Sequence, residues 1–395
     1  MNRRVLLALG VAVAGAVALA VVGLSSGDGG QREPEPPPGA VDLRPCRAVI
    51  AADRARDCIA RQFSAVVAGR RDPRPAVERI AAAARRQGGF VLTNCHVVMH
   101  TVGRTYAEDA GLELATLMER LPRSNDPGCS AGFAHGLVTA VAPQFELTRP
   151  EEATALCGKA GTRYQRYSCV HGFGHAFMRL YGADLEPSLK LCRALGADSA
   201  PDCAQGAYHD YWFAVLGADE TSLPDGAVTD PRRLCGDQPR DFVRGCWYRA
   251  LLETRPEGLK VSAPGDLDAI CDGLAGLQRE ACITGAAVIG PAAPAAQLRI
   301  CARLRVASDA RGCIRGTKVP NLLDRPIADH VRLIRRCGSF PRATRADCYR
   351  WLGKTLAVLT DGEFGRSGCA RLAPPARGHC AAGARTIDEA LVTFS

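Results

Sequence analysis

The sequence predicts an all-α protein, an α-solenoid of disulfide-stapled helical hairpins with repeats of about 35 residues. Three observations predict this fold. The 18 cysteines fall into regularly spaced pairs, and the residues around the pairs follow one plan of helix, polar turn and helix. Alternating runs of β-branched residues, which are typical of strands, are nearly missing. Because one thin hairpin buries little apolar surface, stacked neighbours and covalent staples would supply the stability.

The N-terminal residues are expected to direct the chain out of the cytoplasm. Arg3 and Arg4 precede an uncharged apolar run at 5–24, and its 20 residues are enough to span a bilayer as a helix. Residues 1–24 therefore indicate a signal anchor, or a signal peptide cleaved after a small-x-small site formed by Ala18 and Ala20. We expect a protein that is either anchored in the membrane by this helix, with the membrane as a partner, or secreted.

The residues after this segment divide into a linker and a repeat domain. Residues 25–45 are rich in proline and glycine and read as a flexible linker. Residues 46–395 form the expected repeat domain, which would lie outside the cytoplasm in a bacterial-type cell envelope. Within this domain the histidines define a rich half at 90–215 and a poor half at 216–395.

The cysteine spacing predicts which sulfur atoms are joined. Cysteines of an exported chain are expected to be oxidised. Eight pairs are 11 or 12 residues apart, and the remaining two, Cys95 and Cys129, are then expected to join adjacent repeats. The predicted disulfides are Cys46–Cys58, Cys95–Cys129, Cys157–Cys169, Cys192–Cys203, Cys235–Cys246, Cys271–Cys282, Cys301–Cys313, Cys337–Cys348 and Cys369–Cys380.

Each staple is expected to join the two helices of one hairpin near their turn. In "LKLCRALGADSAPDCAQGAYHDYWFAVLG" one helix ends at the first cysteine, and the next opens at Asp202 with the second cysteine in its first turn. A short loop closed in this way contributes about 3 kcal/mol on the chain-entropy model. Glycine stands three residues after the second cysteine in six repeats, which predicts close helix approach, at positions 132, 172, 206, 285, 316 and 383.

This plan is similar to that of Sel1-like repeat proteins, particularly their disulfide-stapled, cysteine-rich members. The resemblance covers roughly residues 46–395 and concerns architecture. It implies stacked helical hairpins, although the two cysteines of a pair stand further apart here. Because a shared fold does not carry a shared function, the resemblance transfers no functional residue.

Six of the eight histidines fall between positions 96 and 209, and they follow the repeat. His135, His175 and His209 each lie six residues after the second cysteine of three successive repeats, and His100 lies five residues after Cys95. The later repeats have other residue types at the sixth position. The repeat fold itself therefore does not require histidine there.

Two further histidines, His96 and His171, lie one helical turn before His100 and His175 and share their helix faces. If equivalent positions line up on successive helices, the six imidazoles gather in one groove beside Asp210. Their rings would have to converge within about 5–6 Å to share an ion. The sequence therefore predicts a metal site made of His96, His100, His135, His171, His175, His209 and Asp210.

A transition metal, Fe, Zn or Cu, is the expected cofactor because imidazole nitrogens suit these ions. The chain has no CxxC motif and no GxGxxG after a strand, so nothing indicates c-type haem or a nucleotide. HEAT-type helical-repeat hydroxylases resemble this strategy, since they build a dinuclear iron site from paired motifs on successive repeats. Their pairs are His-Glu, whereas this chain has His-Asp once, at His209–Asp210, and HxxxH twice.

These observations favour a metal-binding protein, with a metalloenzyme as one form of it. Arg104 and Arg179 follow the histidine pairs by one more helical turn, where they would hold an anionic substrate. In a second interpretation the histidines bind an organic ligand or sense pH in a groove lined by Tyr106, Tyr164, Tyr167, Tyr208, Tyr211 and Trp212.

A function from a different class is a cell-envelope scaffold without catalytic activity, whose concave face binds a protein or peptide partner. The histidines would then be packing residues, which is the role expected of the isolated His330 and His379 in either case. Nucleic acid is not an expected partner, because the 50 basic and 41 acidic residues are interspersed.

Overall fold

The computed structural model describes residues 41–46, 55–144, 149–216, 223–254 and 259–386. Within these ranges every regular element is a helix, as the sequence predicts. The second cysteine of each pair lies in a helix, and so do Cys95 and Cys129. We call these the inner helices: α1 (Ala55–Val67), α3 (Gly89–Asp109), α5 (Cys129–Val141), α7 (Arg163–Leu180), α9 (Ala200–Val215), α11 (Val243–Thr254), α13 (Gly276–Val288), α15 (Ala307–Arg315), α17 (Arg342–Leu359) and α18 (Pro374–Arg385).

A second set of helices, most of them shorter, alternates with the inner helices along most of the chain, and we call these the outer helices. Several begin at a proline or an aspartate cap, where residues of this type satisfy or remove free backbone N–H groups. The outer helices are α2 (Arg74–Gln87), α4 (Leu117–Arg120), α6 (Glu151–Cys157), α8 (Leu185–Ala194), α10 (Pro231–Gly236), α12 (Pro264–Ile270), α14 (Pro294–Cys301) and α16 (Ile327–Arg335).

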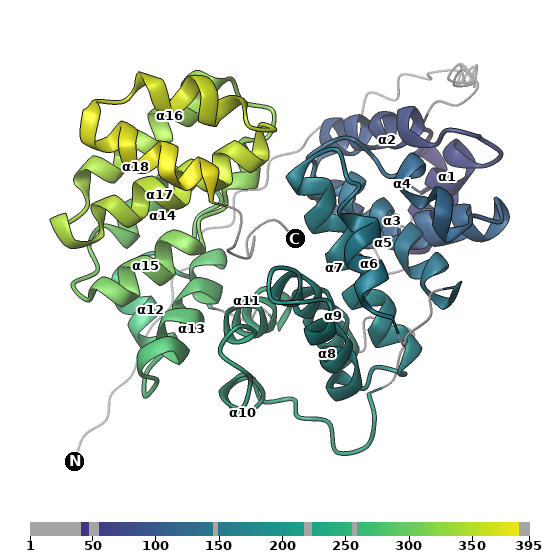
Figure 1. Ribbon diagram of the computed structural model, residues 1–395, viewed down its shortest axis with the longest axis horizontal. Coiled ribbons are helices and arrows are strands. Elements are labelled where there is room, and N and C mark those ends of the chain that lie inside the picture. The colour runs from purple at the N-terminus through teal and green to yellow at the C-terminus, as the bar shows by residue number, and fades with distance from the viewer. Residues whose placement is uncertain (1–40, 47–54, 145–148, 217–222, 255–258, 387–395) are drawn as a thin grey trace, which may run out of the picture. The chain divides into compact units, whose positions relative to one another are not determined.

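Consecutive inner helices pack against one another, from α3 on α5 through α7, α9 and α11 onward (Figure 1). The close helix approach predicted from the repeated glycines is present between the helices that carry the histidines. A Cβ atom on Gly132 of α5 would lie 2.0 Å from the carbonyl oxygen of His96 on α3. A Cβ atom on Gly206 of α9 would lie 2.1 Å from the carbonyl oxygen of His171 on α7. Only glycine lets these backbones touch, and this contact brings side chains of neighbouring repeats together.

Local sequence signals place the long helix α7 in register with its neighbours. Thr162 precedes the helix, and its hydroxyl accepts a hydrogen bond from the backbone N–H of Gln165. The side chain of Gln165 in turn accepts a hydrogen bond from the backbone N–H of Thr162, which completes a capping box. The start of α7, and with it the position of both its histidines, is therefore encoded locally.

All nine predicted cysteine pairs are joined in the structure. Eight of them connect an inner helix to the segment just before it, and so staple a hairpin at its turn. The ninth, Cys95–Cys129, connects the inner helices α3 and α5, with the two Cα atoms 5.0 Å apart. The two helices that carry His96, His100 and His135 are thus covalently linked.

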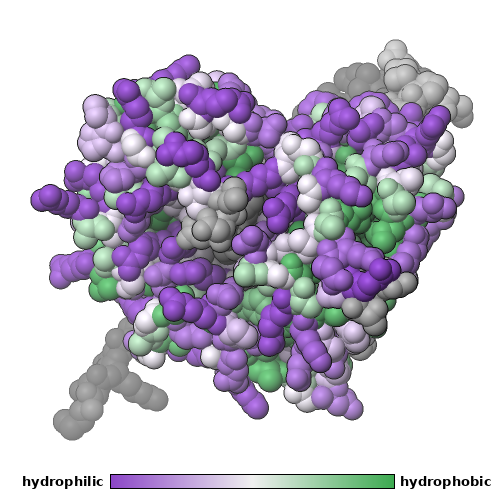
Figure 2. Space-filling model, viewed as in Figure 1, coloured by the Kyte–Doolittle hydropathy of each residue, from purple (hydrophilic) through white to green (hydrophobic). Residues whose placement is uncertain are grey.

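Apolar residues of the inner and outer helices form one large core that runs through the described part of the chain, and Tyr248 and Val288 form a small second cluster. On the face shown in Figure 2 hydrophilic residues dominate, and hydrophobic residues appear in small patches. The stapled hairpins predicted from the sequence are confirmed. Their order as a regular solenoid, and the domain boundaries proposed above, stay predictions.

The predicted membrane attachment requires a correction. Of the helices in the described ranges, none is long and apolar enough to cross a bilayer. The apolar run at 5–24, which suggested an anchor by its length alone, lies outside the described residues, as does most of the linker at 25–45. Anchoring by an N-terminal helix is therefore not supported.

Candidate metal centre

The six histidines between positions 96 and 209 lie on four inner helices and meet in the interior. Those on α5, α7 and α9 are at most 3% exposed. His96 and His100 on α3 are partly buried. Centroids of neighbouring rings in this cluster lie 4.6–6.2 Å apart. The convergence expected from the repeat register is therefore present, but in a buried centre rather than along an open groove.

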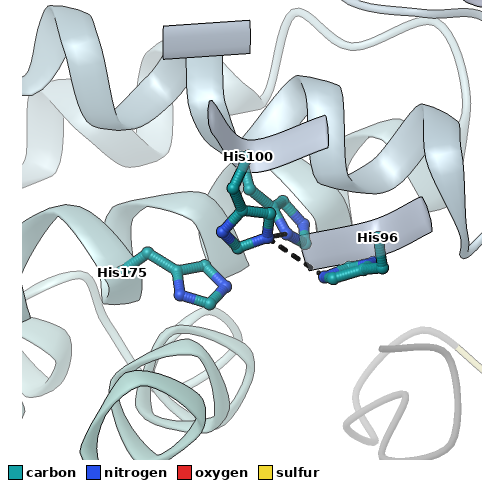
Figure 3. Close-up of side chains that lie close together, drawn as sticks. His96, His100 and His175 are labelled. Carbon is teal, nitrogen blue, oxygen red and sulfur yellow. Dashed lines mark hydrogen bonds between the residues drawn. The ribbon is translucent and has the colours of Figure 1, made fainter. Parts of the chain in front are cut away.

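Four of the imidazoles offer nitrogen atoms that lie within 4.8 Å of one another. We call them the first nitrogen group: His96, His100, His135 and His175. Figure 3 shows the rings of His96 and His175 on opposite sides of His100. Three helices, α3, α5 and α7, contribute to this group, so it exists only when consecutive repeats are packed.

Distances inside the first nitrogen group match those between ligands of one ion. The Nε2 atom of His100 lies 3.1 Å from Nε2 of His96 and 3.2 Å from Nδ1 of His135. Two nitrogens bound tetrahedrally at 2.0–2.1 Å from a zinc ion would be about 3.3 Å apart. The nitrogens therefore need little movement to bind a common ion.

Hydrogen bonds around His96 leave a lone pair directed into the centre. Its Nδ1 atom lies 2.8 Å from the carbonyl oxygen of Pro127, which can only accept, so Nδ1 carries the hydrogen. The neutral ring then has a lone pair on Nε2, which faces His100. Because Nε2 of His100 carries at most one hydrogen, this N–H can align with His96 or with His135 but not with both. A cation would satisfy all three nitrogens at once.

His175 has the arrangement that is common for histidine ligands of metals. Its Nδ1 atom lies 2.7 Å from Oδ1 of Asp210 on α9, and the carboxylate accepts the N–H. Its Nε2 atom is buried and has no hydrogen-bond partner among the described residues. A carboxylate that holds one nitrogen fixes the tautomer and directs the lone pair of the other nitrogen. The structure therefore places the Asp210 carboxylate against Nδ1 of His175 and outside the two nitrogen groups, and its predicted role as a ligand stays a prediction.

His171, His175 and His209 form a second nitrogen group, which shares His175 with the first. Nδ1 of His209 is buried without a partner within the described ranges, and its Nε2 lies 3.6 Å from the carboxylate of Glu253. Nε2 of His171, however, lies 3.4 Å from the guanidinium of Arg249. A positive side chain thus lies beside one of the two nitrogens of His171.

Sequence reasoning missed Arg249 and Glu253, both on α11 in the histidine-poor half. Arg249 is 1% exposed and donates a hydrogen bond of 2.9 Å to Glu253. Two signals in the repeat register could have found them. Arg249 stands three residues after Cys246, where six other repeats have glycine. Glu253 stands seven residues after its cysteine, as Asp210 does in the preceding repeat.

Burial keeps most of the cluster neutral. The pKa of His96 is lowered to about 3, chiefly by burial and in part by the positive charge of Arg249, while the hydrogen bond to the Pro127 carbonyl opposes the shift. Burial also lowers the pKa of four more imidazoles well below the usual value of 6.5: His100, His135, His171 and His209. Neutral imidazole is the form that binds metals, so these nitrogens are competent ligands at neutral pH.

A cavity of about 190 Å³ reaches the first nitrogen group from the surface. His100, His175 and Asp210 are among its lining residues, and so are the arginines Arg56, Arg104 and Arg179. This cavity gives an ion a path to the otherwise buried nitrogens.

Other side chains considered from the sequence lie elsewhere. His330 hydrogen-bonds through Nε2 to the carbonyl oxygen of Leu322, which confirms its packing role. Among the aromatic residues, Tyr167 contacts His171. Three other tyrosine hydroxyls donate hydrogen bonds away from the cluster. Tyr106 donates to the carbonyl oxygen of Arg70, Tyr208 to Oε1 of Gln238, and Tyr211 to the carbonyl oxygen of Val228.

Comparisons with known proteins return no relative. No family model matches the chain, and neither a curated protein nor a solved structure matches it. The geometry of the histidine cluster therefore carries the functional argument by itself.

Proposed function

We propose that this protein binds one transition-metal ion, Fe, Zn or Cu, through the first nitrogen group. The observation that carries this proposal is the mutual approach of four imidazole nitrogens to within 4.8 Å. Nε2 of His330 meets a backbone carbonyl, whereas Nε2 of His100 meets imidazole nitrogens of His96 and His135. The Nε2 atom of His175 is buried without a hydrogen-bond partner in the described part of the chain.

The donor atoms define the class of ion. All 18 cysteines are in disulfides, so no thiolate competes with the imidazoles. Neutral nitrogen ligands suit Zn, Cu, Fe and Ni better than the hard ions Mg and Ca, which prefer oxygen. Nine disulfides also favour an oxidising compartment, and we place the protein outside the cytoplasm.

Charge favours the first nitrogen group over the second. The guanidinium of Arg249 lies 3.4 Å from Nε2 of His171, so an ion bound at this nitrogen would lie close to another positive charge in a buried site. Asp210 lies behind His175, which both groups share, so its carboxylate offsets part of the charge of an ion in either group and the preference comes from Arg249. We therefore assign the ion to His96, His100, His135 and His175, and expect one ion per chain.

The test is metal analysis of the oxidised, full-length chain. Samples are loaded separately with Zn²⁺, Cu²⁺ and Fe²⁺, the last without oxygen, then desalted and analysed by inductively coupled plasma mass spectrometry. About one ion per chain is expected for at least one metal. His100→Ala and His175→Ala should lose it, whereas His379→Ala, which changes a histidine outside the cluster, should keep it.

Circular dichroism of each variant separates loss of ligands from loss of fold. A parent protein without stoichiometric metal under every loading condition would overturn the proposal. Folded His100→Ala that retains the ion would overturn the assignment of the ligands.

A further inference from the structure

We propose that the cavity beside the first nitrogen group binds a small oxyanion, a carboxylate or a phosphate, and holds it against the metal ion. This inference rests on the proposed metal binding and names the class of ligand that the site would take. It is carried by the arginines of the cavity, by their spacing from the histidines, and by the size of the space.

Two arginines of the cavity continue the histidine spacing by one helical turn. On α3 the chain reads HVVMHTVGR, so that Arg104 follows His100 by four residues. On α7 it reads HGFGHAFMR, so that Arg179 follows His175 by four residues. Residues four apart on a helix share a face. The same HxxxHxxxR pattern on two helices therefore directs two histidines and two arginines toward one space, and all four line the cavity.

The cavity has an excess of positive charge before any ion is bound. Arg56, Arg104 and Arg179 line it together with two carboxylates, Asp57 and Asp210. Asp210 is already engaged by His175. The guanidinium of Arg104 has no hydrogen bond or ion pair with the described residues. A divalent ion at the histidines would add two further positive charges, so an anion is the ligand that this space attracts.

Guanidinium groups also give the site its preference for oxyanions. Each presents a planar set of N–H donors that matches two oxygens of a carboxylate or phosphate. The Nε atom of Arg56 donates to Asn94 at 2.8 Å, which holds this side chain at the cavity wall. One oxygen of a bound anion would point to the ion, and the others would meet the arginines.

The volume limits the size of the ligand. A cavity of about 190 Å³ corresponds to about six water molecules at 30 Å³ each. This is enough for phosphate or a short carboxylic acid, but it is smaller than the pockets of 300–1,000 Å³ that bury drug-sized ligands. A nucleotide or a peptide therefore does not fit inside.

The experiment uses the full-length chain loaded with Co²⁺, whose visible absorption reports on its ligands. The protein is titrated with inorganic phosphate and, separately, with acetate, at constant ionic strength set with chloride. We expect a saturable spectral change with either anion. Arg104→Gln and Arg179→Gln should weaken the anion affinity at least tenfold while the Co²⁺ content stays unchanged. Arg166→Gln, which alters an exposed arginine of α7, should behave as the parent.

The outcomes separate this inference from the proposed function. If Co²⁺ binds and no saturable change occurs, or the arginine variants respond as the parent does, the anion site is wrong and the metal site stands. If no metal binds, calorimetric titration of the metal-free chain with phosphate decides. Binding that requires Arg104 and Arg179 would support the anion site alone, and no binding would overturn it.

Discussion

The Nδ1 atom of His175 lies 2.7 Å from Oδ1 of Asp210, and the opposite nitrogen of the same ring is buried without a partner in the described part of the chain. The two residues come from different inner helices, α7 and α9. The carboxylate fixes the hydrogen on Nδ1, so that the lone pair of Nε2 points to His100 and the cavity. This pair connects the packing of two repeats to the chemistry of the centre.

Removing the carboxylate should weaken metal binding without removing a ligand. We expect Asp210→Asn to lower the metal affinity about 10–100-fold, the usual effect of losing a group that orients a histidine ligand. Competition with a chelator of known affinity measures the change. Asp198→Asn, which alters an exposed aspartate near the start of α9, is the matched control and should leave the affinity unchanged. Equal affinities for Asp210→Asn and the parent would show that the carboxylate does not orient the ligand.

Substituting a histidine in the first nitrogen group should change the metal content, whereas substituting one that belongs only to the second group should not. His100→Ala removes the nitrogen that lies 3.1–3.2 Å from two others and should abolish stoichiometric binding. His171→Ala should keep the ion, because Arg249 already faces the nitrogen that this substitution removes. Metal analysis of both variants under one loading protocol provides the comparison. The reverse order would move the ion to the second nitrogen group.

Close packing of the inner helices should be needed for both stability and metal binding. In Gly132→Ala the added carbon would meet the carbonyl oxygen of His96 at 2.0 Å, so α3 and α5 must separate. Overpacking of this kind costs about 1–3 kcal/mol, and here it also displaces a ligand. Denaturant unfolding and metal analysis measure the two effects.

The control for this substitution is Gly378→Ala on α18, where an added carbon meets no atom within 4 Å. Alanine is a better helix former than glycine by about 1 kcal/mol, so this variant should be equally or more stable. Similar destabilisation of both variants would mean that loss of glycine itself, and not the contact with His96, is responsible.

The metal-free protein should lose stability as the pH falls below 6.5. Burial holds the pKa of His96 at about 3 in the folded chain, whereas the unfolded chain takes up this proton near pH 6.5. Between these values the unfolded state binds more protons, so the free energy of unfolding decreases as the pH decreases. Each such histidine contributes up to about 1.4 kcal/mol per pH unit.

Urea unfolding at pH 7.5, 6.5 and 5.5 measures this slope. His171→Gln should reduce it by up to one proton, because burial also depresses the pKa of His171. Above pH 6.5 these histidines are neutral in both states and contribute no slope. A free energy of unfolding that is constant or rises from pH 7.5 to 5.5 would contradict the expected burial of neutral imidazoles.

The spacing of the cysteines, and the positions of the histidines relative to them, were sufficient to predict the hairpins, their disulfides and the convergence of six imidazoles. They worked because one repeat places equivalent positions on consecutive helices, and the later repeats without histidine showed that the fold does not require it. Cys95 and Cys129 were predictable by elimination, since no other cysteines were left to pair.

The electrostatics of the centre were not predictable in the same way. Arg249 lies on α11, beyond the histidine-rich half, and its place in the repeat register marks it as unusual without showing that it contacts His171. Its role follows from a three-dimensional contact, 3.4 Å to His171, that no local pattern describes. The orienting role of Asp210 likewise depends on the distance between α7 and α9, which Gly206 makes possible.

X-ray absorption spectroscopy of the metal-loaded, full-length protein tests the central claim most directly. For zinc we expect a nitrogen shell of three or four imidazoles at about 2.0–2.1 Å, with the outer-shell scattering of histidine rings. His100→Ala should lose this signal. A shell that contains sulfur at about 2.3 Å, or oxygen ligands without imidazole scattering, would contradict the histidine centre.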